Sequence, residues 1–263
     1  MVDCGKEVIH MLDTLIRGAQ VVDGTGRAAF PADVGILDGM IEEVGDLQGA
    51  QAFETIEANG RVLTPGFIDI HRHADAAVFR EDFGRSELSQ GLTTLVNGNC
   101  GMSLAPLFSA HADECARYLA PITGNIEPAL RFDSLASYFK AAQGHGLPLS
   151  CAELIGMGTL RTLAAGFAAG ELSPLALREL HYHMEQALAD GACGVSLGLG
   201  YAPEIFYSTD GLIRALAPLH RSGVPICVHM RQEGDGVVGA LREMLEVARA
   251  LQTPLEVSQF MAN

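Results

Sequence analysis

The stretch PGFIDIHRH, residues 65–73, joins a short apolar run to a His-x-His pair. Its β-branched and aromatic residues, preceded by proline and glycine, predict a short buried strand. Side chains alternate along a strand, so His71 and His73 are expected to project to the same side near its C-terminal end. Neutral imidazole is a favoured zinc ligand, and the pair therefore predicts half of a metal site. The alternative is that one of the two histidines is a satisfied core or surface residue.

The composition favours a soluble α/β enzyme and disfavours two classes of partner. The chain has 263 residues, of which 48% are hydrophobic, which is enough to bury a sizeable core. Its 17 basic and 32 acidic residues give a formal net charge of −15, which opposes binding to nucleic acid or to anionic membranes. The segment Met1–Asp13 does not resemble a signal peptide, and no apolar run is long enough to span a membrane. We therefore expect a cytoplasmic protein.

Two regions of different pattern divide the chain. Leu12–Asp23 and Ala32–Asp46 alternate apolar and polar residues around Asp-Gly turns, which predicts short antiparallel strands and hairpins. From Gly66 onward, short apolar strands are separated by helical stretches, as in successive βα units. We expect an N-terminal extension and a small β portion over residues 1–62, followed by a barrel-type domain over residues 63–263.

The second region is expected to contain six strands: Gly66–His73, Thr93–Cys100, Leu149–Gly156, Cys193–Gly200, Pro225–Arg231 and Pro254–Phe260. Helices are expected between them over Ser134–Ala142, Pro174–Ala189, Asp210–His220 and Val237–Leu251. The predicted fold class is α/β, a TIM-like (βα)8 barrel of which this chain carries about six βα units. Because closure of such a barrel needs eight strands, three possibilities stay open: a fragment, strands supplied from elsewhere, or an open sheet.

Two further ligand-type residues stand at the ends of other expected strands. Cys100 ends the second strand and His229 lies at the end of the fifth. The C-terminal ends of barrel strands meet at one face, where they would join the first two histidines. Thiolate and imidazole both suit zinc. The sequence therefore predicts a site for one or two zinc ions made by His71, His73, Cys100 and His229.

Other polar residues can be interpreted in two ways. His181 and His183 form a second His-x-His pair, but they lie in an expected helix, where residues two apart do not face one another. Asp75 and Glu233 are the acids nearest in sequence to the expected ligands. Glu233 is interpreted as solvated rather than as a partner of a histidine, whereas for Asp75 both interpretations stay open. Arg231 is a candidate for binding an anionic substrate, with an ion pair to a neighbouring acid as the alternative.

These segments also resemble a known family. PGFIDIHRHAD, GLTTLVNGNCGMSLAP, GTLR, GACGVSLGLGYAPE and VHMRQEGD are similar to the D-aminoacylase (N-acyl-D-amino-acid deacylase) branch of the amidohydrolase superfamily. The resemblance implies an amidohydrolase-type barrel with a small β-sandwich. It also implies that the cysteine of Gly-Asn-Cys-Gly replaces the carboxylated lysine of other superfamily members as a ligand, and that Tyr201 lies near the substrate. The implied zinc ligands are His71, His73, Cys100 and His229.

The sequence departs from the family pattern at the sixth strand. The family has Ser-His followed after one residue by lysine, whereas this chain has SQFM at residues 258–261. The expected histidine ligand is Gln259, and the lysine that would engage a substrate carboxylate is Met261. Met157 replaces the histidine of the family's His-Gly-Thr-Leu-Arg. The family's catalytic carboxylate would lie beyond Asn263, which leaves Asp75 as a candidate base within the chain.

The leading hypothesis is a zinc-dependent amidohydrolase that converts a small N-acyl-D-amino acid, a linear amide, to a carboxylate and a D-amino acid. No nucleic-acid or membrane partner is expected, and an oligomer is left open. One alternative is a catalytically inactive truncated or divergent paralogue with a residual metal site, which Gln259 and Met261 favour. Another is a cyclic-amide hydrolase of the dihydroorotase or hydantoinase type, which the Gly-Asn-Cys-Gly motif disfavours. Without the family's carboxylate, activity of the 263-residue chain alone is not expected.

Overall fold

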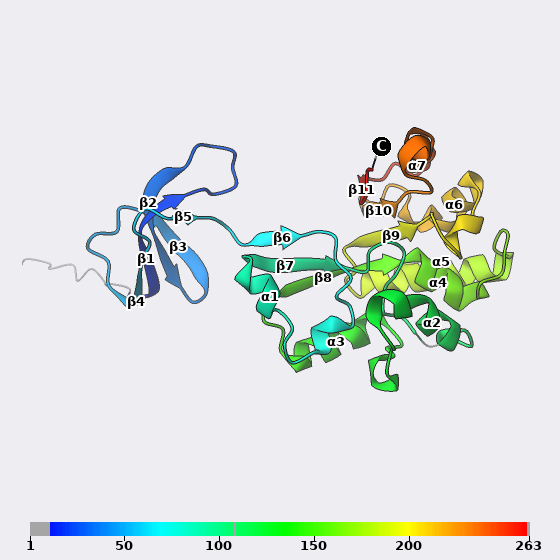
Figure 1. Cartoon of the computed structure of the whole chain (residues 1–263), viewed down its shortest axis with the longest axis horizontal. Coiled ribbons are helices and arrows are strands. Elements are labelled where there is room, and N and C mark those ends of the chain that lie inside the picture. Colours follow the sequence, from blue (N-terminus) through cyan, green and yellow to red (C-terminus); the bar gives the residue numbers. More distant parts are fainter. Residues whose placement is uncertain (1–10, 108, 262–263) are drawn as a thin grey trace, which may run out of the picture. The chain divides into compact units, whose positions relative to one another are not determined.

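The computed structural model of the chain describes residues 11–107 and 109–261. The chain divides into two compact units, Met1–Gly66 and Phe67–Asn263, each with its own sheet (Figure 1). The expected N-terminal extension, residues 1–10, lies outside the described residues.

The first unit is a mixed β-sheet with the strand order β3-β2-β1-β4, and β5 also pairs with β1. The antiparallel pairing of β1 with β2 and of β2 with β3 confirms the predicted hairpins. The β2–β3 turn uses Asp38 and Gly39, whose φ angles of 50° and 75° are those that an Asp-Gly hairpin turn requires. The sequence did not predict β4 and β5, which run parallel to β1. The strands are β1 (Leu12–Val21), β2 (Phe30–Leu37), β3 (Met40–Gly45), β4 (Ala52–Glu57) and β5 (Val62–Leu63).

The core of this first unit is small. One apolar cluster centres on Leu12, Leu15 and Leu47, and a second on Val21 and Val34. On the outer strands, the side chains stay open to solvent, with Met40 69% and Phe53 76% exposed. A β-sandwich consists of two sheets, and the described residues of the first unit form one of them.

The second unit is built on a parallel six-stranded sheet in the order β11-β10-β9-β8-β7-β6. This confirms the six expected strands, although most of them end earlier than predicted. β6 ends at Asp69, so His71 and His73 lie in the loop after it rather than on the strand itself. The strands are β6 (Phe67–Asp69), β7 (Leu92–Asn97), β8 (Ser150–Gly156), β9 (Gly194–Gly198), β10 (Ile226–His229) and β11 (Leu255–Val257).

α-Helices follow most of these strands (Figure 1). Short 3-10 helices lie in the connections between these elements. The α-helices are α1 (Arg85–Ser89), α2 (Ala112–Thr123), α3 (Leu135–His145), α4 (Met157–Ala165), α5 (Pro174–Ala189), α6 (Thr209–Ala215) and α7 (Val237–Leu251). The 3-10 helices are η1 (Ala77–Phe79), η2 (Pro128–Leu130), η3 (Glu204–Phe206), η4 (Ala217–Leu219) and η5 (Gly234–Gly236). Ser134 and Ser173 cap α3 and α5 by accepting backbone N–H hydrogen bonds. None of the helices among the described residues has the length and apolarity needed to cross a bilayer.

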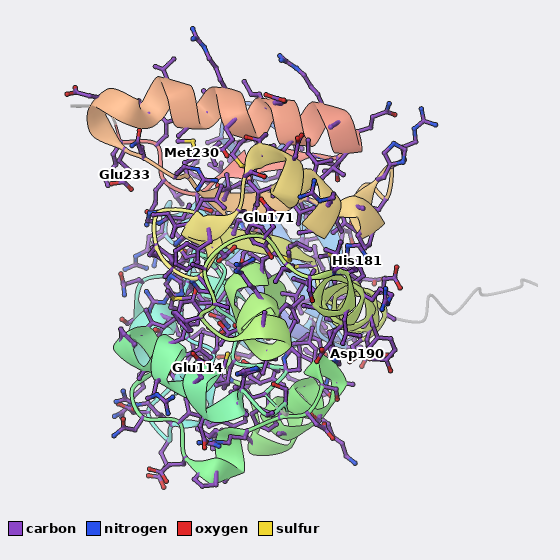
Figure 2. All side chains as sticks on the ribbon, turned by 90° about the vertical axis from the view of Figure 1, so that its right-hand side faces the viewer. Glu114, Glu171, His181, Asp190, Met230 and Glu233 are labelled. Atoms are coloured by element: carbon purple, nitrogen blue, oxygen red, sulfur yellow. The ribbon has the colours of Figure 1, made fainter. Side chains whose placement is uncertain are left out.

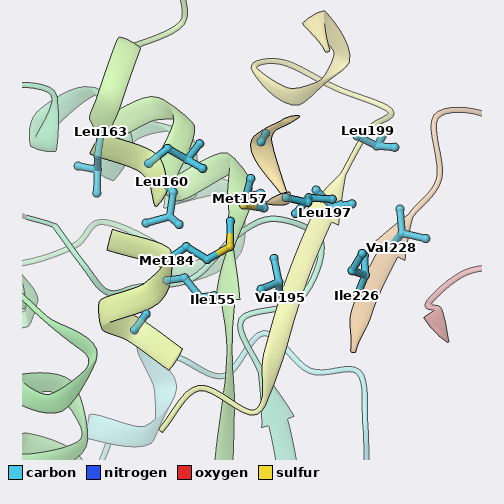
Figure 3. Packing of buried hydrophobic residues seen from close by; sticks show 14 of the residues in the cluster. Ile155, Met157, Leu160, Leu163, Met184, Val195, Leu197, Leu199, Ile226 and Val228 are labelled. Carbon is cyan, nitrogen blue, oxygen red and sulfur yellow. The ribbon is translucent and has the colours of Figure 1, made fainter. Parts of the chain in front are cut away.

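One face of the parallel sheet packs against the helices and forms the main core. Val195 and Leu197 of β9 and Val228 of β10 are fully buried beside Leu160 of α4 and Met184 of α5 (Figure 3). Burying side chains of this size contributes about 1.5–3 kcal/mol each.

The alternate residues of these strands therefore face the other side of the sheet. In the parallel register, Cys227 of β10 lies opposite Ser196 of β9 and Glu256 of β11, and His229 lies opposite Gly198. Because the strands are parallel, their C-terminal ends share one edge, which brings His229 toward the loops after β6 and β7.

The isolated 263-residue chain is expected to self-associate. Among the described strands, β6 and β11 are paired on one side only, and Ile68 and Ile70 beside the β6 edge are 61% and 60% exposed. Unpaired strand edges with apolar side chains favour edge-to-edge pairing. Size-exclusion chromatography with light scattering should show oligomers, and the double variant Ile68→Lys, Ile70→Lys should reduce them. A monodisperse wild-type monomer with a cooperative melting transition would contradict this expectation.

Candidate metal centre

Four ligand-type side chains from two loops and a strand end come together. Potential ligand atoms of His71, His73 and Cys100 all lie within 4.8 Å of one another. Cys100 Sγ is 3.4 Å from His71 Nε2 and 3.8 Å from Nδ1 of His229, the last residue of β10. The structure therefore brings the four predicted zinc ligands into one cluster.

The chemistry of the histidines fits a metal. The buried Nδ1 atoms of His71 and His73 have no hydrogen-bond partner among the described residues. Burial lowers the pKa of His71, and burial together with His71 and His229 lowers the pKa of His73 to about 4. Both imidazoles are therefore neutral near pH 7, which is the form that coordinates a cation. Burial raises the pKa of the Cys100 thiol to about 11, and a bound divalent cation would reverse that preference by stabilising the thiolate.

Glycines allow the tight loop that presents Cys100. Cys100 has a φ of 56°, in the left-handed region, and its neighbours Gly98 and Gly101 have φ values of 71° and 74°. A Cβ on Gly98 would collide with the Leu154 carbonyl oxygen, and one on Gly101 would collide with the Glu204 carboxylate. The two glycines of Gly-Asn-Cys-Gly are therefore required by both backbone conformation and space.

Asn99, the remaining residue of that motif, ties the cysteine loop to the histidine loop. Its Nδ2 donates to the carbonyl oxygens of Val96 at 2.9 Å and of Ile70 and Arg72 at 3.4 Å each. The last two carbonyls flank His71 in sequence. The buried amide thus fixes the backbone that carries the first ligands relative to the backbone that carries Cys100.

Residues within and after β9 also hold the cysteine loop. Ser196 Oγ accepts a hydrogen bond from the Gly101 N–H at 3.0 Å. The Tyr201 hydroxyl donates to the Cys100 carbonyl oxygen at 2.6 Å, and the Tyr201 ring lies 5.4 Å from the His229 ring between centroids. The structure therefore places Tyr201, the residue expected near the substrate, against the ligand cluster.

Glu233 lies beside His229 rather than free in solvent. His229 Nε2 is 3.7 Å from Glu233 Oε1, while its Nδ1 faces the Cys100 sulfur. A carboxylate on the distal nitrogen is a common way to orient a metal-binding imidazole and to fix its tautomer. Figure 2 shows Glu233 on the opposite side of the view from His181, the first residue of the helical His-x-His pair. His181 contacts the Arg214 carbonyl through Nε2 at 2.9 Å.

The two remaining sequence candidates are engaged inside the protein. Asp75 is 1% exposed, and its Oδ1 accepts the Leu104 N–H at 3.3 Å. Burial raises the pKa of Asp75 to about 6. The Arg231 guanidinium makes two 2.9 Å contacts with the Glu243 carboxylate and donates to the Tyr207 carbonyl at 2.9 Å. The ion pair that the sequence left as an alternative for Arg231 is the arrangement found.

Two acids near the cluster were missed from the sequence. Glu204, the first residue of η3, is 0% exposed, and its Oε2 accepts the Gly198 N–H at 3.0 Å. Glu256 lies opposite Cys227 on the face that also carries His229, and its Oε2 accepts from Ser258 Oγ at 2.8 Å. Glu204 is part of the GYAPE segment of the family resemblance, whereas Glu256 could be placed only by the strand register.

Replacing Glu204 with glutamine is expected to make the free energy of unfolding less dependent on pH. Burial raises the pKa of Glu204 from 4.5 to about 8. The folded protein then keeps this proton to a higher pH than the unfolded chain does, so stability is fully present below about pH 4.5 and is lost as pH rises through about 8. Urea unfolding at about pH 5 and about pH 9 should show a smaller loss in Glu204→Gln. Glu246→Gln, at an exposed position on α7, is the control, and an equal loss in all three proteins would refute the expectation.

Comparison with known proteins identifies relatives with this fold and these segments. No family model matches the chain. The D-aminoacylase of Alcaligenes xylosoxydans xylosoxydans is 35% identical over 249 residues, which cover 94% of this chain and 50% of that protein. The chain thus spans about half the length of the relatives it matches.

Solved structures give the same result. A D-aminoacylase structure described for its binuclear metal centre matches with a TM-score of 0.85 at 32% identity, covering 95% of this chain and 52% of that one. N-acyl-D-glutamate deacylase from Bordetella bronchiseptica, solved with zinc and a phosphonate mimic of the tetrahedral intermediate, matches with a TM-score of 0.87 at 31% identity, covering 96% and 52%. The parallel sheet of the second unit is accordingly part of a TIM-like barrel. In sequence and in fold, the chain is similar to the D-aminoacylase branch of the amidohydrolases over about half the length of those proteins.

Proposed function

We propose that the cluster is a zinc centre for hydrolysis of the linear amide in an N-acyl-D-amino acid. The observation that carries the proposal is the convergence of His71, His73, Cys100 and His229. Relatives named as deacylases of N-acyl-D-aspartate and N-acyl-D-glutamate support the substrate class.

The contacts of individual residues support the roles that we propose for them. Cys100 and His229 would hold the ion together with His71 and His73, as one site or as two adjacent sites, since D-aminoacylase is described with a binuclear centre. A zinc ion held there would polarise the amide carbonyl and lower the pKa of water. Tyr201 would contact the substrate beside the metal, because its ring packs against His229. Arg231 has no substrate role in the proposal, since its guanidinium is used by Glu243.

The base for the proton transfer is assigned to none of the nearby acids. Glu233 is engaged with His229. Asp75 is buried, and its Oδ1 is engaged by the Leu104 N–H of the loop after β7. Glu256 bonds to Ser258 and faces Cys227, one layer below His229 on the sheet. A general base must reach the attacking water within about 3 Å, directly or through one water. The proposal therefore assigns the proton transfer to the carboxylate that the family resemblance places beyond Asn263.

A second candidate, an inactive relative with a residual metal site, is favoured by one observation. Gln259 and Met261 follow β11 where the family pattern has histidine and lysine, and the Met261 side chain is 55% exposed. An amide is a weak zinc ligand, and a thioether offers no charge to a substrate carboxylate.

Binding of a phosphonate mimic tests the proposal. The zinc-loaded protein should bind an N-acyl-D-amino-acid phosphonate more tightly than its L-isomer and than a hydantoin, and removal of zinc should abolish this binding in isothermal titration. Cys100→Ala is the matched variant. Zinc binding without zinc-dependent binding of the D-phosphonate would support the inactive relative, and preference for the hydantoin would support a cyclic-amide hydrolase.

A further inference from the structure

A buried carboxyl group lies directly behind the cysteine loop. Glu204 Oε2 receives the Gly198 N–H at 3.0 Å, at the end of β9. The same oxygen lies so close to Gly101 that a Cβ there would collide with it, and a Cβ on Gly158, in the first turn of α4, would come to 2.7 Å from it. The carboxyl therefore fills the space between three chain segments: the cysteine loop, α4 and the end of β9.

The segment that carries Glu204 is itself anchored. Tyr207, which follows η3, lies under the guanidinium of Arg161 from α4, with 4.4 Å between Cζ and the ring centroid. Arg161 is 1% exposed and donates to the carbonyl oxygens of Ala168 and Gly170. A buried guanidinium over an aromatic face holds the two segments together and limits movement of η3 away from the cysteine loop.

Other contacts also restrict the cysteine loop, which lies against Glu204. Gly101 is fixed at its N–H by Ser196 and at its carbonyl oxygen by the Thr159 N–H at 3.0 Å. Cys100 sits next to it in the left-handed region, a conformation that a cysteine adopts only when its surroundings impose it.

From these contacts we infer that Glu204 is a positioning residue of the metal centre. It supports the Gly101 backbone and so sets the direction in which Cys100 Sγ faces the histidines. This inference rests on the proposed zinc centre and assigns Glu204 no contact with substrate or metal.

Two substitutions separate shape from hydrogen bonding. Glu204→Gln keeps the length of the side chain and an oxygen for the Gly198 N–H, so zinc affinity should stay within about threefold of wild type. Glu204→Met keeps most of the volume but loses the acceptor, and Glu204→Ala loses both. Because partners behind a metal ligand typically contribute 10–100-fold, zinc affinity by chelator competition should fall at least about 10-fold in Glu204→Met and further in Glu204→Ala.

A spectroscopic measurement distinguishes positioning from general destabilisation. With Co²⁺ as the probe, the near-ultraviolet thiolate-to-metal charge-transfer band should weaken or shift in Glu204→Met and stay unchanged in Glu204→Gln. Leu180→Ala, in the buried face of α5, is the control, because it lowers the melting temperature without touching the loop.

The outcomes are distinct. A wild-type charge-transfer band and wild-type zinc affinity in Glu204→Met would overturn the inference, and so would equal losses in the Leu180→Ala control. If Cys100→Ala itself leaves both readouts unchanged, the proposed zinc centre fails instead. Should Glu204→Ala not fold, Glu204→Met, which leaves no large cavity, decides the question.

Discussion

Replacing Cys100 with alanine is expected to lower the affinity for zinc more than about 100-fold, since loss of a direct ligand exceeds the 10–100-fold typical of residues behind the ligands. Cys100 supplies the only sulfur in the cluster and lies within 3.8 Å of ligand nitrogens from both His71 and His229. His229→Ala should have an effect of the same order. Metal content after dialysis and competition with a chromophoric chelator would measure both.

The chain offers a matched control for this experiment. His181→Ala removes a histidine of the same local pattern, His-x-His, but from the outer surface of α5, where it contacts the Arg214 carbonyl. Zinc affinity should be unchanged in that variant. If Cys100→Ala and His229→Ala retain as much zinc as His181→Ala, the four side chains are not the binding site.

The second large effect concerns turnover. The 263-residue chain alone is expected to hydrolyse N-acetyl-D-amino acids about 10²–10⁴-fold more slowly than a form that carries a suitably placed carboxylate, because that is the usual contribution of a general base. Gln259→His with Met261→Lys should strengthen metal and substrate binding without restoring the rate, since neither substitution supplies a base. Release of free D-amino acid, followed by chromatography, measures this.

The same assay includes a positive control, in which the missing carboxylate is supplied. Addition or fusion of the C-terminal half of the Alcaligenes D-aminoacylase should raise the rate, and zinc removal should abolish the gain. Robust zinc-dependent turnover by the unsupplemented chain would contradict the expectation and would return Asp75 and Glu256 to consideration as bases. Substitution of each by its amide would then identify which one acts.

Much of the barrel portion could be predicted from local patterns. The Ser173-Pro174 start of α5 and its end at Ala189 follow from capping chemistry, which depends on neighbours in sequence. The gathering of Cys100 and His229 follows from parallel strand order, because every such strand delivers its end to one edge. The closeness of His71 and His73 was predicted from side-chain alternation along a strand. Both residues lie instead in the loop after β6, where their closeness depends on tertiary contacts.

The sequence did not predict which residues contact and support the metal ligands. Glu204 and Arg161 are ionisable residues that are fully buried, and ionisable side chains are normally expected to be exposed. Glu233 was interpreted as solvated, because nothing in its spacing fixes the rotation of the His229 ring. The parallel pairing of β4 with β1 was missed because the chain between β3 and β4 is no tight turn, and loop paths leave no periodic pattern.

The amide of Asn99 has a consequence for the thermodynamics of metal capture. Its three carbonyl contacts order the loop of His71 and His73 as part of folding, before any ion arrives. Ordering the backbone of one residue costs about 1–2 kcal/mol in conformational entropy. Here that cost belongs to folding rather than to metal binding. An ion would therefore meet a prepared set of donors, and its binding free energy would be spent on coordination with little lost to loop ordering. The loop would correspondingly stay ordered when the ion leaves, because the Asn99 contacts do not depend on the ion.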